Sequence, residues 1–328
     1  MIDDHRWMGA ALALGERGRG RTAPNPNVGC VIVSEGRVVG RGWTQPGGRP
    51  HAEAMALAEA GEQARGATVY VTLEPCAHVS PRGPACCDLL QLAGVARVVV
   101  AMEDPDVRTN GAGVARLRDA GITAEVGVRA DEARRAMAGF LARRLLGRPH
   151  VTLKLAVSLD GAMALASGQS VWITGPQARA HAHLERARHE AILVGRGTFE
   201  ADAPKLDVRL AGLESRSPQR ILLSRTETDG WTRIAAPADI STLEAVDHVL
   251  VEGGPATAAA FLASDLVDRL LLYRAPILIG GGRTLPDIGL TDLADAHGRW
   301  RPIESRSLGS DRLEVYERVR EPAPGARG

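Results

Sequence analysis

The sequence predicts an α/β protein built from two domains. Its 328 residues are more than a single hydrophobic core ordinarily organises. Strand-type and helix-type segments alternate along both halves, a pattern typical of parallel sheets with helices packed on their faces. The glycine and proline of the segment 145–150 interrupt this alternation. We therefore expect domains at 1–147 and 148–320, followed by a disordered tail at 321–328 that is rich in proline and glycine.

In the first half, each element follows from its local pattern. Residues 28–43 carry β-branched residues on either side of Glu35 and Gly36, which predicts a hairpin that turns at these two residues. Further β-branched clusters predict strands at 67–75, 96–105 and 122–126. Helices are predicted at 52–66, 84–94, 111–121 and 130–147, each of which ends at a glycine.

The second half alternates in the same manner and predicts a second α/β unit. Strands are expected at 150–161, 189–198, 219–224, 247–254 and 268–281. Helices are expected at roughly 176–187 and 256–263.

Composition excludes several classes of partner. Net charge is only +1 and 3% of residues are aromatic, so the chain offers neither a basic coat nor stacking surfaces for nucleic acid. The charged start is unlike a signal peptide, and no apolar run reaches the ~18 to 20 residues of a membrane span. We expect a soluble, cytoplasmic protein that acts on small molecules.

The cysteines indicate a metal site. Three of the four lie within the stretch 76–87, which is a poor disulfide framework. His51 precedes a predicted helix, Cys76 follows a strand, and Cys86 opens the next helix, where free N–H groups favour a thiolate. Helical periodicity places Cys86 on the inward face and Cys87 about 100° away from it. The sequence therefore predicts a zinc ion on His51, Cys76 and Cys86, with Cys87 a spare buried thiol.

Glu53 lies two positions beyond His51 and is expected to carry protons instead of binding metal. His-x-Glu followed by Pro-Cys and further cysteine is the pattern of zinc deaminases, in which zinc-generated hydroxide attacks a ring carbon. A purely structural zinc is the alternative, with His78 as the fourth ligand. Glu53 and the strand–turn–helix context favour catalysis, and we expect His78 to contact substrate.

Ordered motifs extend this interpretation to the whole chain. "TAPNPNVG", "HAEA", "TLEPCAH" and "PACCD" are followed by "KLAVSLDG", "SGQSVWITG", "GRGTFEADAPKLDVR" and "LVEGGPATAAAFL". In this order the motifs resemble the RibD family of bifunctional riboflavin-biosynthesis enzymes. The resemblance implies a cytidine-deaminase-like three-layer domain followed by a dihydrofolate-reductase-like α/β domain.

The resemblance also implies two activities. The first domain would remove the amino group of 2,5-diamino-6-(5-phosphoribosylamino)pyrimidin-4(3H)-one. The second would reduce the ribosyl side chain of 5-amino-6-(5-phosphoribosylamino)uracil to ribityl with NADPH. The zinc ligands of the family fall on His51, Cys76 and Cys86, its proton carrier falls on Glu53, and Asn25 would reach the pyrimidine edge. The other interpretation of Asn25 is an Asn-Pro turn.

Two loops of the first domain depart from the family pattern. The segment "HVSPRGPA" replaces His-x-Gly-Arg-Thr-Pro-Pro and is one residue longer, which shifts the arginine to Arg82. The segment "DPDVRTNGAG" has Asp106 and Val107 where the family usually has Asn-Pro. The zinc assignment is unaffected, but the phosphate contacts of loop 79–85 stay open.

In the second domain, "VLVEGGPATAAAF" combines a strand, two glycines and a helix. Paired glycines let the backbone approach a phosphate, and the helix N-terminus supplies free N–H donors, although such turns often serve only tight packing. No Gly-x-Gly-x-x-Gly motif follows a strand, which argues against a Rossmann domain.

The resemblance assigns further contacts in the second domain. Those with the nucleotide would be made by Ala156, Trp172, Thr198, Asp202, Gly254, Pro255, Ala256 and Thr257. Those with the substrate would be made by Ser170, Arg186, Leu206, Arg209 and Glu252. The sequence alone favours a solvated helix face for Arg186. Asp202, Glu252 or water could supply the proton in the reduction.

Two other functions compete with this one. A nucleoside or tRNA deaminase with an unrelated second domain would share the zinc motif, although the near-neutral charge argues against tRNA. A structural zinc beside a nucleotide-sensing domain would be a non-catalytic protein. We also expect a homodimer or homotetramer.

Overall fold

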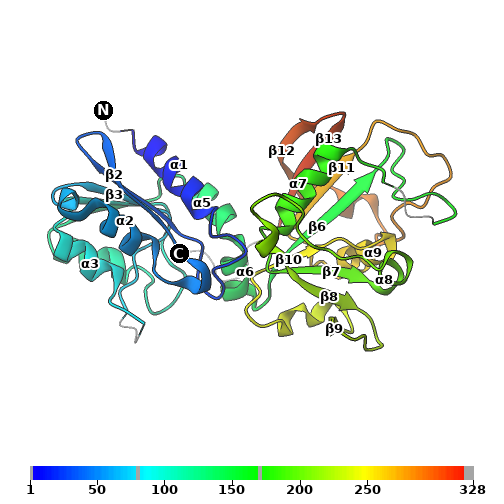
Figure 1. Cartoon of the computed structure of the whole chain (residues 1–328), viewed down its shortest axis with the longest axis horizontal. Helices are drawn as coiled ribbons and strands as arrows, with labels where there is room; N and C mark the ends of the chain where they lie inside the picture. The colour runs from blue at the N-terminus through cyan, green and yellow to red at the C-terminus, as the bar shows by residue number, and fades with distance from the viewer. Residues whose placement is uncertain (1–2, 79–81, 169–171, 321–328) are drawn as a thin grey trace. The chain divides into compact units, whose positions relative to one another are not determined.

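The computed structural model of the chain describes residues 3–78, 82–168 and 172–320 (Figure 1). The chain divides between Arg148 and Pro149 into two compact units, each with its own sheet. The expected tail at 321–328 and the expected substrate contact Ser170 lie outside the described residues.

The first unit is an α/β domain. Its strands are β1 (Gly29–Ser34), β2 (Arg37–Trp43), β3 (Thr68–Val71), β4 (Arg97–Val100) and β5 (Thr123–Val126). Its helices are α1 (Asp4–Gly15), α2 (Ala52–Ala60), α3 (Cys86–Ala93), α4 (Ala112–Asp119), α5 (Ala130–Ala136) and α6 (Ala138–Leu146). The short 3-10 turns η1 (Pro46–Gly48) and η2 (Gly61–Ala64) flank α2.

Its five strands form one sheet in the order β2-β1-β3-β4-β5. The predicted hairpin at Glu35 and Gly36 is confirmed as β1–β2, whose strands pair antiparallel. β3, β4 and β5 are parallel to one another, as expected for strands joined by single helices. Their carboxyl ends therefore meet at one edge of the sheet.

Helices cover both faces of this sheet and give three layers. A side chain at Gly29 of β1 would lie 1.8 Å from the carbonyl oxygen of Ala11 in α1. A side chain at Gly42 of β2 would lie 2.0 Å from the carbonyl oxygen of Ala52 in α2. Gly29 pairs with Trp43, the neighbour of Gly42, so the two glycines point to opposite faces. The predicted three-layer architecture is confirmed (Figure 1).

One prediction for this unit was wrong, and one helix was not predicted. Residues 130–147 form two helices, because the chain leaves helical geometry at Met137, which is fully buried. Helix α1 was not predicted, because two of its four buried positions, Ala11 and Gly15, are small and leave a weak apolar stripe.

The second unit is also an α/β domain. Its strands are β6 (His150–Val157), β7 (Ala191–Gly195), β8 (Gln219–Leu223), β9 (Thr232–Ile234), β10 (His248–Val251), β11 (Arg269–Arg274), β12 (Trp300–Leu308) and β13 (Asp311–Arg318). Its helices are α7 (Pro176–Arg186), α8 (Arg196–Asp202) and α9 (Pro255–Ala263). The 3-10 turns are η3 (Glu214–Arg216), η4 (Pro237–Thr242) and η5 (Leu293–Ala296).

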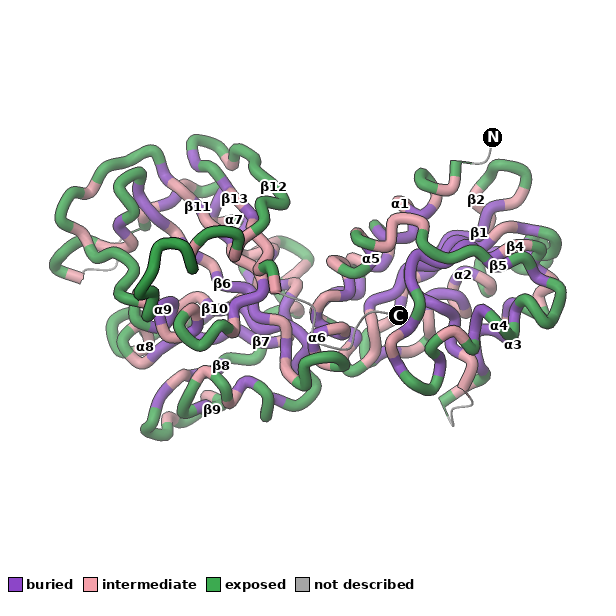
Figure 2. The backbone as a smooth tube through the Cα atoms, turned by 180° about the vertical axis from the view of Figure 1, so that it is seen from behind, coloured by how far each residue is buried: buried purple, intermediate pink, exposed green. Residues whose placement is uncertain are grey.

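These strands form an eight-stranded sheet in the order β12-β13-β11-β6-β10-β7-β8-β9. β11, β6, β10, β7, β8 and β9 are parallel. The β12–β13 hairpin continues the sheet, with β13 antiparallel to β11 and β12 antiparallel to β13. β6, β10 and β7 are neighbours, so the residues that follow them gather at one edge, the usual ligand site of open α/β sheets. Most residues of these central strands are buried, as the purple colour in Figure 2 shows.

The sequence analysis missed several elements of this unit. Residues 196–198 begin helix α8 and do not extend strand β7. The β12–β13 hairpin was overlooked because β12 is exposed along its length and contains Pro302, so it shows no apolar alternation. In β13 the signal was present, since Leu313 and Val315 are buried at a spacing of two.

Every helix within residues 3–78, 82–168 and 172–320 is too short or too polar to cross a lipid bilayer.

Candidate active sites

Three side chains from separate elements converge in the first unit. His51 immediately precedes α2, Cys76 follows β3, and Cys86 is the first residue of α3. His51 Nδ1 lies 3.3 Å from Cys86 Sγ and 3.7 Å from Cys76 Sγ, and the three donor atoms lie within 4.8 Å of one another. One imidazole nitrogen and two sulfurs are a donor set that suits zinc.

The two neighbouring cysteines of α3 face different surroundings. The Cys87 thiol donates to the carbonyl oxygen of Pro75 at 3.2 Å, and burial raises the pKa of Cys87 to about 12. Cys86 turns its sulfur to His51 and donates its backbone N–H to Cys76 Sγ at 3.3 Å. Hydrogen bonding from Cys86 lowers the pKa of Cys76, which favours the thiolate that binds metal.

The ring of His51 is held from its far side. Asn25 Nδ2 lies 3.2 Å from His51 Nε2 and also donates to the carbonyl oxygen of Gly48 at 2.9 Å. A side chain at Gly48 would lie 2.6 Å from Asn25 Cγ, so only glycine leaves room for the amide. A metal on Nδ1 leaves the ring proton on Nε2, so in that state Nε2 would need the Oδ1 atom of Asn25, and not Nδ2, as its acceptor.

Glu53 belongs to the same site without joining the donor set. It lies in the first turn of α2 and is 3% exposed. Burial raises the pKa of its carboxyl group, which suits a residue that takes up and releases protons near neutral pH.

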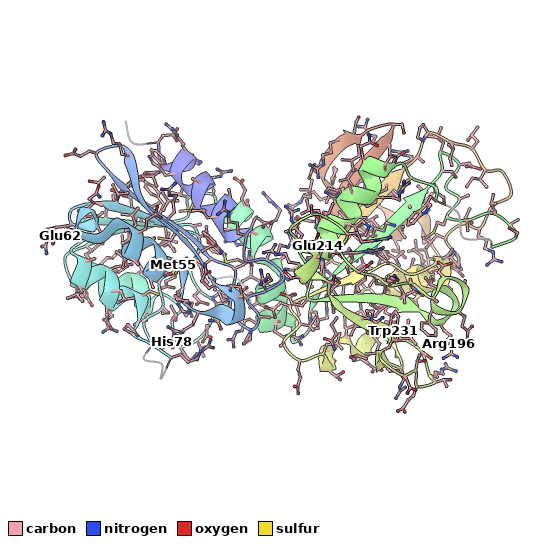
Figure 3. The ribbon with its side chains drawn as sticks, in the orientation of Figure 1. Met55, Glu62, His78, Arg196, Glu214 and Trp231 are labelled. Carbon is pink, nitrogen blue, oxygen red and sulfur yellow. The ribbon has the colours of Figure 1, made fainter. Side chains whose placement is uncertain are left out.

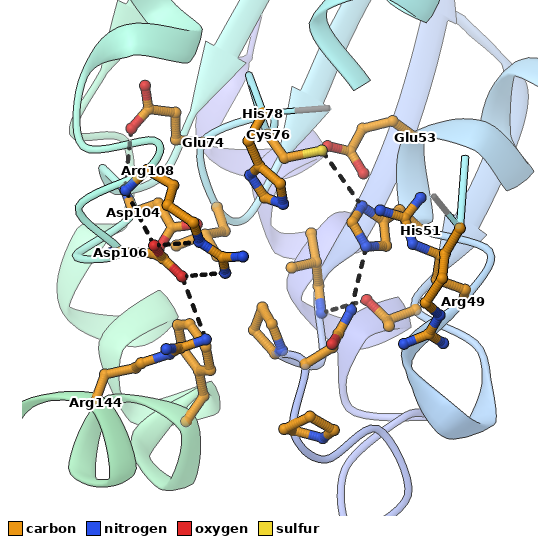
Figure 4. A pocket seen from close by; sticks show the side chains of 18 residues that line it. Arg49, His51, Glu53, Glu74, Cys76, His78, Asp104, Asp106, Arg108 and Arg144 are labelled. Carbon is orange, nitrogen blue, oxygen red and sulfur yellow. Dashed lines mark hydrogen bonds and ion pairs between the residues drawn. The ribbon is translucent and has the colours of Figure 1, made fainter. Parts of the chain in front are cut away.

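A pocket of about 250 Å³ is lined by most of these groups, although not by Cys86 (Figure 4). Asn25, His51, Glu53, Cys76 and His78 all line it. His78, also labelled in Figure 3, lies with its Nδ1 3.5 Å from the hydroxyl of Thr109 and is not part of the donor group.

The same pocket contains charged residues that the sequence analysis did not select. They are Arg49, Glu74, Asp104, Asp106, Arg108 and Arg144. Asp104 and Asp106 follow β4, just as Cys76 follows β3. Because residues after parallel strands gather at one edge of the sheet, the sequence could have indicated that these aspartates belong to the site. Arg144 gives no such signal, since it lies in the exposed, arginine-rich end of α6.

In the second unit, a larger cavity of about 610 Å³ gathers most of the expected nucleotide contacts. Its lining includes Thr198, Asp202, Gly254, Pro255, Ala256 and Thr257. Thr198 and Gly254 follow the neighbouring strands β7 and β10, and the N–H of Gly254 donates to the hydroxyl of Thr198 at 3.1 Å.

Glycines give this cavity its shape. A side chain at Gly195 would lie 2.0 Å from Thr257 Oγ1, and one at Gly253 would lie 2.4 Å from Thr257 Cβ. Both positions therefore require glycine for α9 to approach the strand ends. Trp231, labelled in Figure 3, supports α8 by packing edge-on against Phe199 at 5.3 Å between ring centroids.

Arg186 and Glu252 form a buried ion pair. Glu252 lies two positions before Gly254, which lines this cavity. Arg186 Nε and Nη2 donate to the two oxygens of Glu252 at 2.8 and 2.9 Å. Although burial alone raises the pKa of Glu252, the Arg186 guanidinium holds it below its ordinary value. The solvated helix face that the sequence favoured for Arg186 is thus wrong, because α7 turns this residue to the sheet.

The remaining predicted positions are dispersed. Trp172 and the Arg186–Glu252 pair line a small pocket of about 30 Å³. Leu206 is buried in an apolar cluster, and Arg209 is exposed beside Asp207. Ala156 lies on β6 outside the lining of both cavities described for this unit.

Several cationic residues of these cavities were missed. Among them, Lys154 lines the small pocket, and Arg283 lines the large one. Lys154 stands in a strand, and Arg283 stands in a loop after three glycines, so neither carries a local signal of function.

The architecture and donor set of the first unit are those of a zinc-dependent deaminase of the cytidine type, and a reductase unit follows it. Residues 1–102 match the model of the cytidine and deoxycytidylate deaminase zinc-binding region, and residues 149–313 match the RibD C-terminal domain. The chain belongs to the RibD family, the bifunctional deaminase/reductases of riboflavin biosynthesis.

Relatives match along almost the whole chain. The riboflavin biosynthesis protein RibD of Escherichia coli is 42% identical, with 94% of this chain and 98% of that protein covered. The RibD structure of Acinetobacter baumannii is 36% identical, with a TM-score of 0.86 over 97% of this chain and 99% of that one. The diaminohydroxyphosphoribosylaminopyrimidine deaminase/5-amino-6-(5-phosphoribosylamino)uracil reductase of Thermotoga maritima is 31% identical, with a TM-score of 0.86 over 96% and 99%.

Proposed function

We propose that this chain catalyses two successive reactions of riboflavin biosynthesis. The first is hydrolytic deamination of 2,5-diamino-6-(5-phosphoribosylamino)pyrimidin-4(3H)-one. The second is NADPH-dependent reduction of the ribosyl side chain of 5-amino-6-(5-phosphoribosylamino)uracil to ribityl. Family membership supports both. The observation that carries the first is a zinc-type donor set, two members of which, His51 and Cys76, line one pocket with the buried Glu53.

The donor set fits zinc in kind and number. His51 Nδ1, Cys76 Sγ and Cys86 Sγ would hold the ion, and among the described residues no fourth histidine, cysteine or carboxylate joins the group. When bound there, zinc activates water for attack on the ring carbon that carries the amino group. The alternative of a structural zinc with His78 as fourth ligand lacks support, because His78 stands apart from the group.

Glu53 supplies the proton transfers in this proposal. Its carboxylate takes a proton from the attacking water and delivers it to a ring nitrogen. It then takes the remaining proton from the new hydroxyl group and passes it to the amino group, which leaves as ammonia. Burial raises the pKa of Glu53 above its ordinary value, which favours uptake of a proton by this carboxylate. Asn25 lies beside His51 Nε2 and also lines the pocket, where its amide can contact the pyrimidine edge.

In the second unit, the large cavity is the proposed NADPH site. Gly254, Pro255, Ala256 and Thr257 place the start of α9 at its wall, where free N–H groups favour phosphate. When bound there, NADPH supplies the hydride for the sugar carbon.

The proposed site for the sugar consists of Glu252, which lies two positions before Gly254 in the sequence, and its ion-pair partner Arg186. Glu252, Asp202 and water are candidate donors of the proton to the sugar oxygen. The variants Glu252→Gln and Asp202→Asn, assayed for NADPH oxidation, distinguish the two carboxyl groups from water. The expected homodimer or homotetramer in the cytoplasm stays a prediction, and sedimentation of the purified protein tests its assembly.

Purified protein assayed with the diaminopyrimidine substrate and NADPH tests both activities. We expect ammonia release followed by NADPH oxidation. In Glu53→Gln, ammonia release should fall by about 100- to 10,000-fold because the proton carrier is lost, while zinc content and reduction of the uracil intermediate persist. Glu59→Gln on the same helix is the matched control, since Glu59 is exposed and pairs with Arg41.

Other outcomes would contradict the proposal in different ways. Ammonia release from cytidine or tRNA adenosine, and none from the pyrimidine phosphoribosyl compound, would indicate a nucleoside or tRNA deaminase. Unchanged deamination in Glu53→Gln would remove Glu53 from the mechanism.

A further inference from the structure

The wall of the deaminase pocket carries two arginines that share one carboxylate. Arg108 donates from Nε to Asp106 Oδ1 at 2.9 Å and from Nη2 to Asp106 Oδ2 at 2.6 Å. Arg144, from α6, reaches Asp106 Oδ2 with Nη2 at 3.2 Å. In Figure 4 this group stands across the pocket from His51 and Glu53.

Asp106 is a rigid anchor for the two guanidinium groups. It is 7% exposed, and its carboxylate also accepts the backbone N–H of Arg108 at 3.0 Å. Its own N–H donates to Asp104 Oδ1 at 2.9 Å, which ties the loop to the end of β4. Hydrogen bonding to Arg108 holds the pKa of Asp106 well below its usual range, so this carboxylate is ionised at neutral pH.

The group nevertheless keeps a net positive charge and spare donors. Two guanidinium groups on one carboxylate leave a formal charge of about +1. The side chains of Arg108 and Arg144 remain 55% and 42% exposed. In the described part of the chain, no acceptor is bonded to Nη1 of Arg108 or to Nη1 and Nε of Arg144. The Arg144 guanidinium also lies 5.5 Å from the centroid of the Phe140 ring, which limits its rotation.

From this geometry we infer that Arg108 and Arg144 bind the phosphate of the deaminase substrate, oriented for it by Asp106. Guanidinium groups match phosphate oxygens in geometry and charge, and prior anchoring reduces the entropy lost on binding. The inference rests on the proposed deaminase function and adds the residues that recognise the phosphoribosyl end. The inference agrees with the departure of this loop from the RibD pattern, in which Asp106 replaces the usual asparagine. An aspartate at this position attracts the two arginines, and the arginines, not the aspartate, would contact the phosphate.

The test compares two substrates in the full-length zinc-loaded protein. Ammonia release is measured with the phosphoribosyl compound and with its dephosphorylated ribosylamino counterpart. We expect Arg144→Gln and Arg108→Gln each to lower kcat/KM for the phosphorylated substrate by about 10- to 100-fold, as for loss of a charge-assisted hydrogen bond. The dephosphorylated substrate should be affected less than about threefold, because it makes no such contact.

Further variants separate phosphate binding from a structural role. Arg144→Lys keeps the charge but not the fork, so its kcat/KM should lie between those of the wild type and Arg144→Gln. Arg134→Gln is the control, since Arg134 is exposed in α5 and pairs with Asp131. Zinc content reports whether the deaminase unit of each variant is folded.

Three results would overturn the inference. Equal losses with both substrates would make these arginines structural, and no loss with either would show that phosphate binds elsewhere. In both cases the proposed deaminase function would stand. If the wild type releases no ammonia from the phosphorylated compound, the proposed function itself fails, and the inference fails with it.

Discussion

The two sites of this chain depend on different structural features. The deaminase pocket depends on particular side chains, namely an imidazole, two sulfurs and a buried carboxylate, which three separate elements bring together. The reductase cavity depends more on missing side chains, because Gly195 and Gly253 allow α9 and Thr257 to approach the ends of β7 and β10.

This difference follows from what each ligand requires. A metal ion needs specific donor atoms at fixed separations, so few substitutions preserve the site. A dinucleotide needs an extended cavity and backbone N–H donors, which many sequences provide. The first site should therefore fail when one atom changes, and the second when its backbone spacing changes.

The largest effect is expected at the paired cysteines of α3. Cys86→Ser should lose zinc and lower deamination by more than about 100-fold, since even partners of metal ligands contribute 10- to 100-fold. Cys87→Ser should keep zinc, because its sulfur points to the carbonyl oxygen of Pro75. Metal analysis and ammonia assays measure both variants, and similar zinc loss in the two would contradict the assigned register.

A smaller effect is expected at Gly253. The methyl group of Gly253→Ala would meet Thr257 Cβ at 2.4 Å and force α9 away from the strand end. Overpacking of this kind costs about 1–3 kcal/mol, so we expect a rise of roughly 10-fold or more in KM for NADPH. Deamination by the same protein is the internal control. An unchanged KM would show that the cofactor does not depend on this spacing.

The smallest effect is a pH dependence from Glu252. Its pKa is lowered in the folded unit, so the ion pair with Arg186 stabilises the fold above the unfolded pKa of about 4.3. This contribution is lost as the pH falls through the folded pKa. Urea unfolding of wild type and Glu252→Gln at about pH 6 and about pH 4 should show a shallower pH dependence in the variant. Equal slopes would mean that Glu252 does not titrate as part of the pair.

Sequence reasoning performed differently in the two units as well. In the first, the spacing of His51, Cys76 and Cys86 was interpretable because strand ends and helix starts are local features. The hairpin and the parallel strands were predicted for the same reason. Helix α1 was not predicted because it packs against Gly29, which is distant in sequence. The small residues on its buried face, Ala11 and Gly15, also give little apolar periodicity.

In the second unit, the residues themselves say less. Arg186 resembles any exposed arginine of a charged helix, and only the fold brings it to Glu252, 66 positions away. In the first unit the same holds for Arg144, which lies in an arginine-rich helix end and which only the packing of α6 brings to Asp106. Ion pairs between distant residues leave no periodic signal in a sequence.

The sequence by itself determined the α/β class, the family and the chemistry of the metal donors. Periodicity and the kinds of donor side chain can be recognised within short segments of the chain. The tertiary structure alone decided which arginines line the pocket, where glycines let a helix approach the strand ends, and which carboxylates are paired with arginines. These properties depend on distances between segments that are far apart in the chain, and burial there sets both the charge state and the available space.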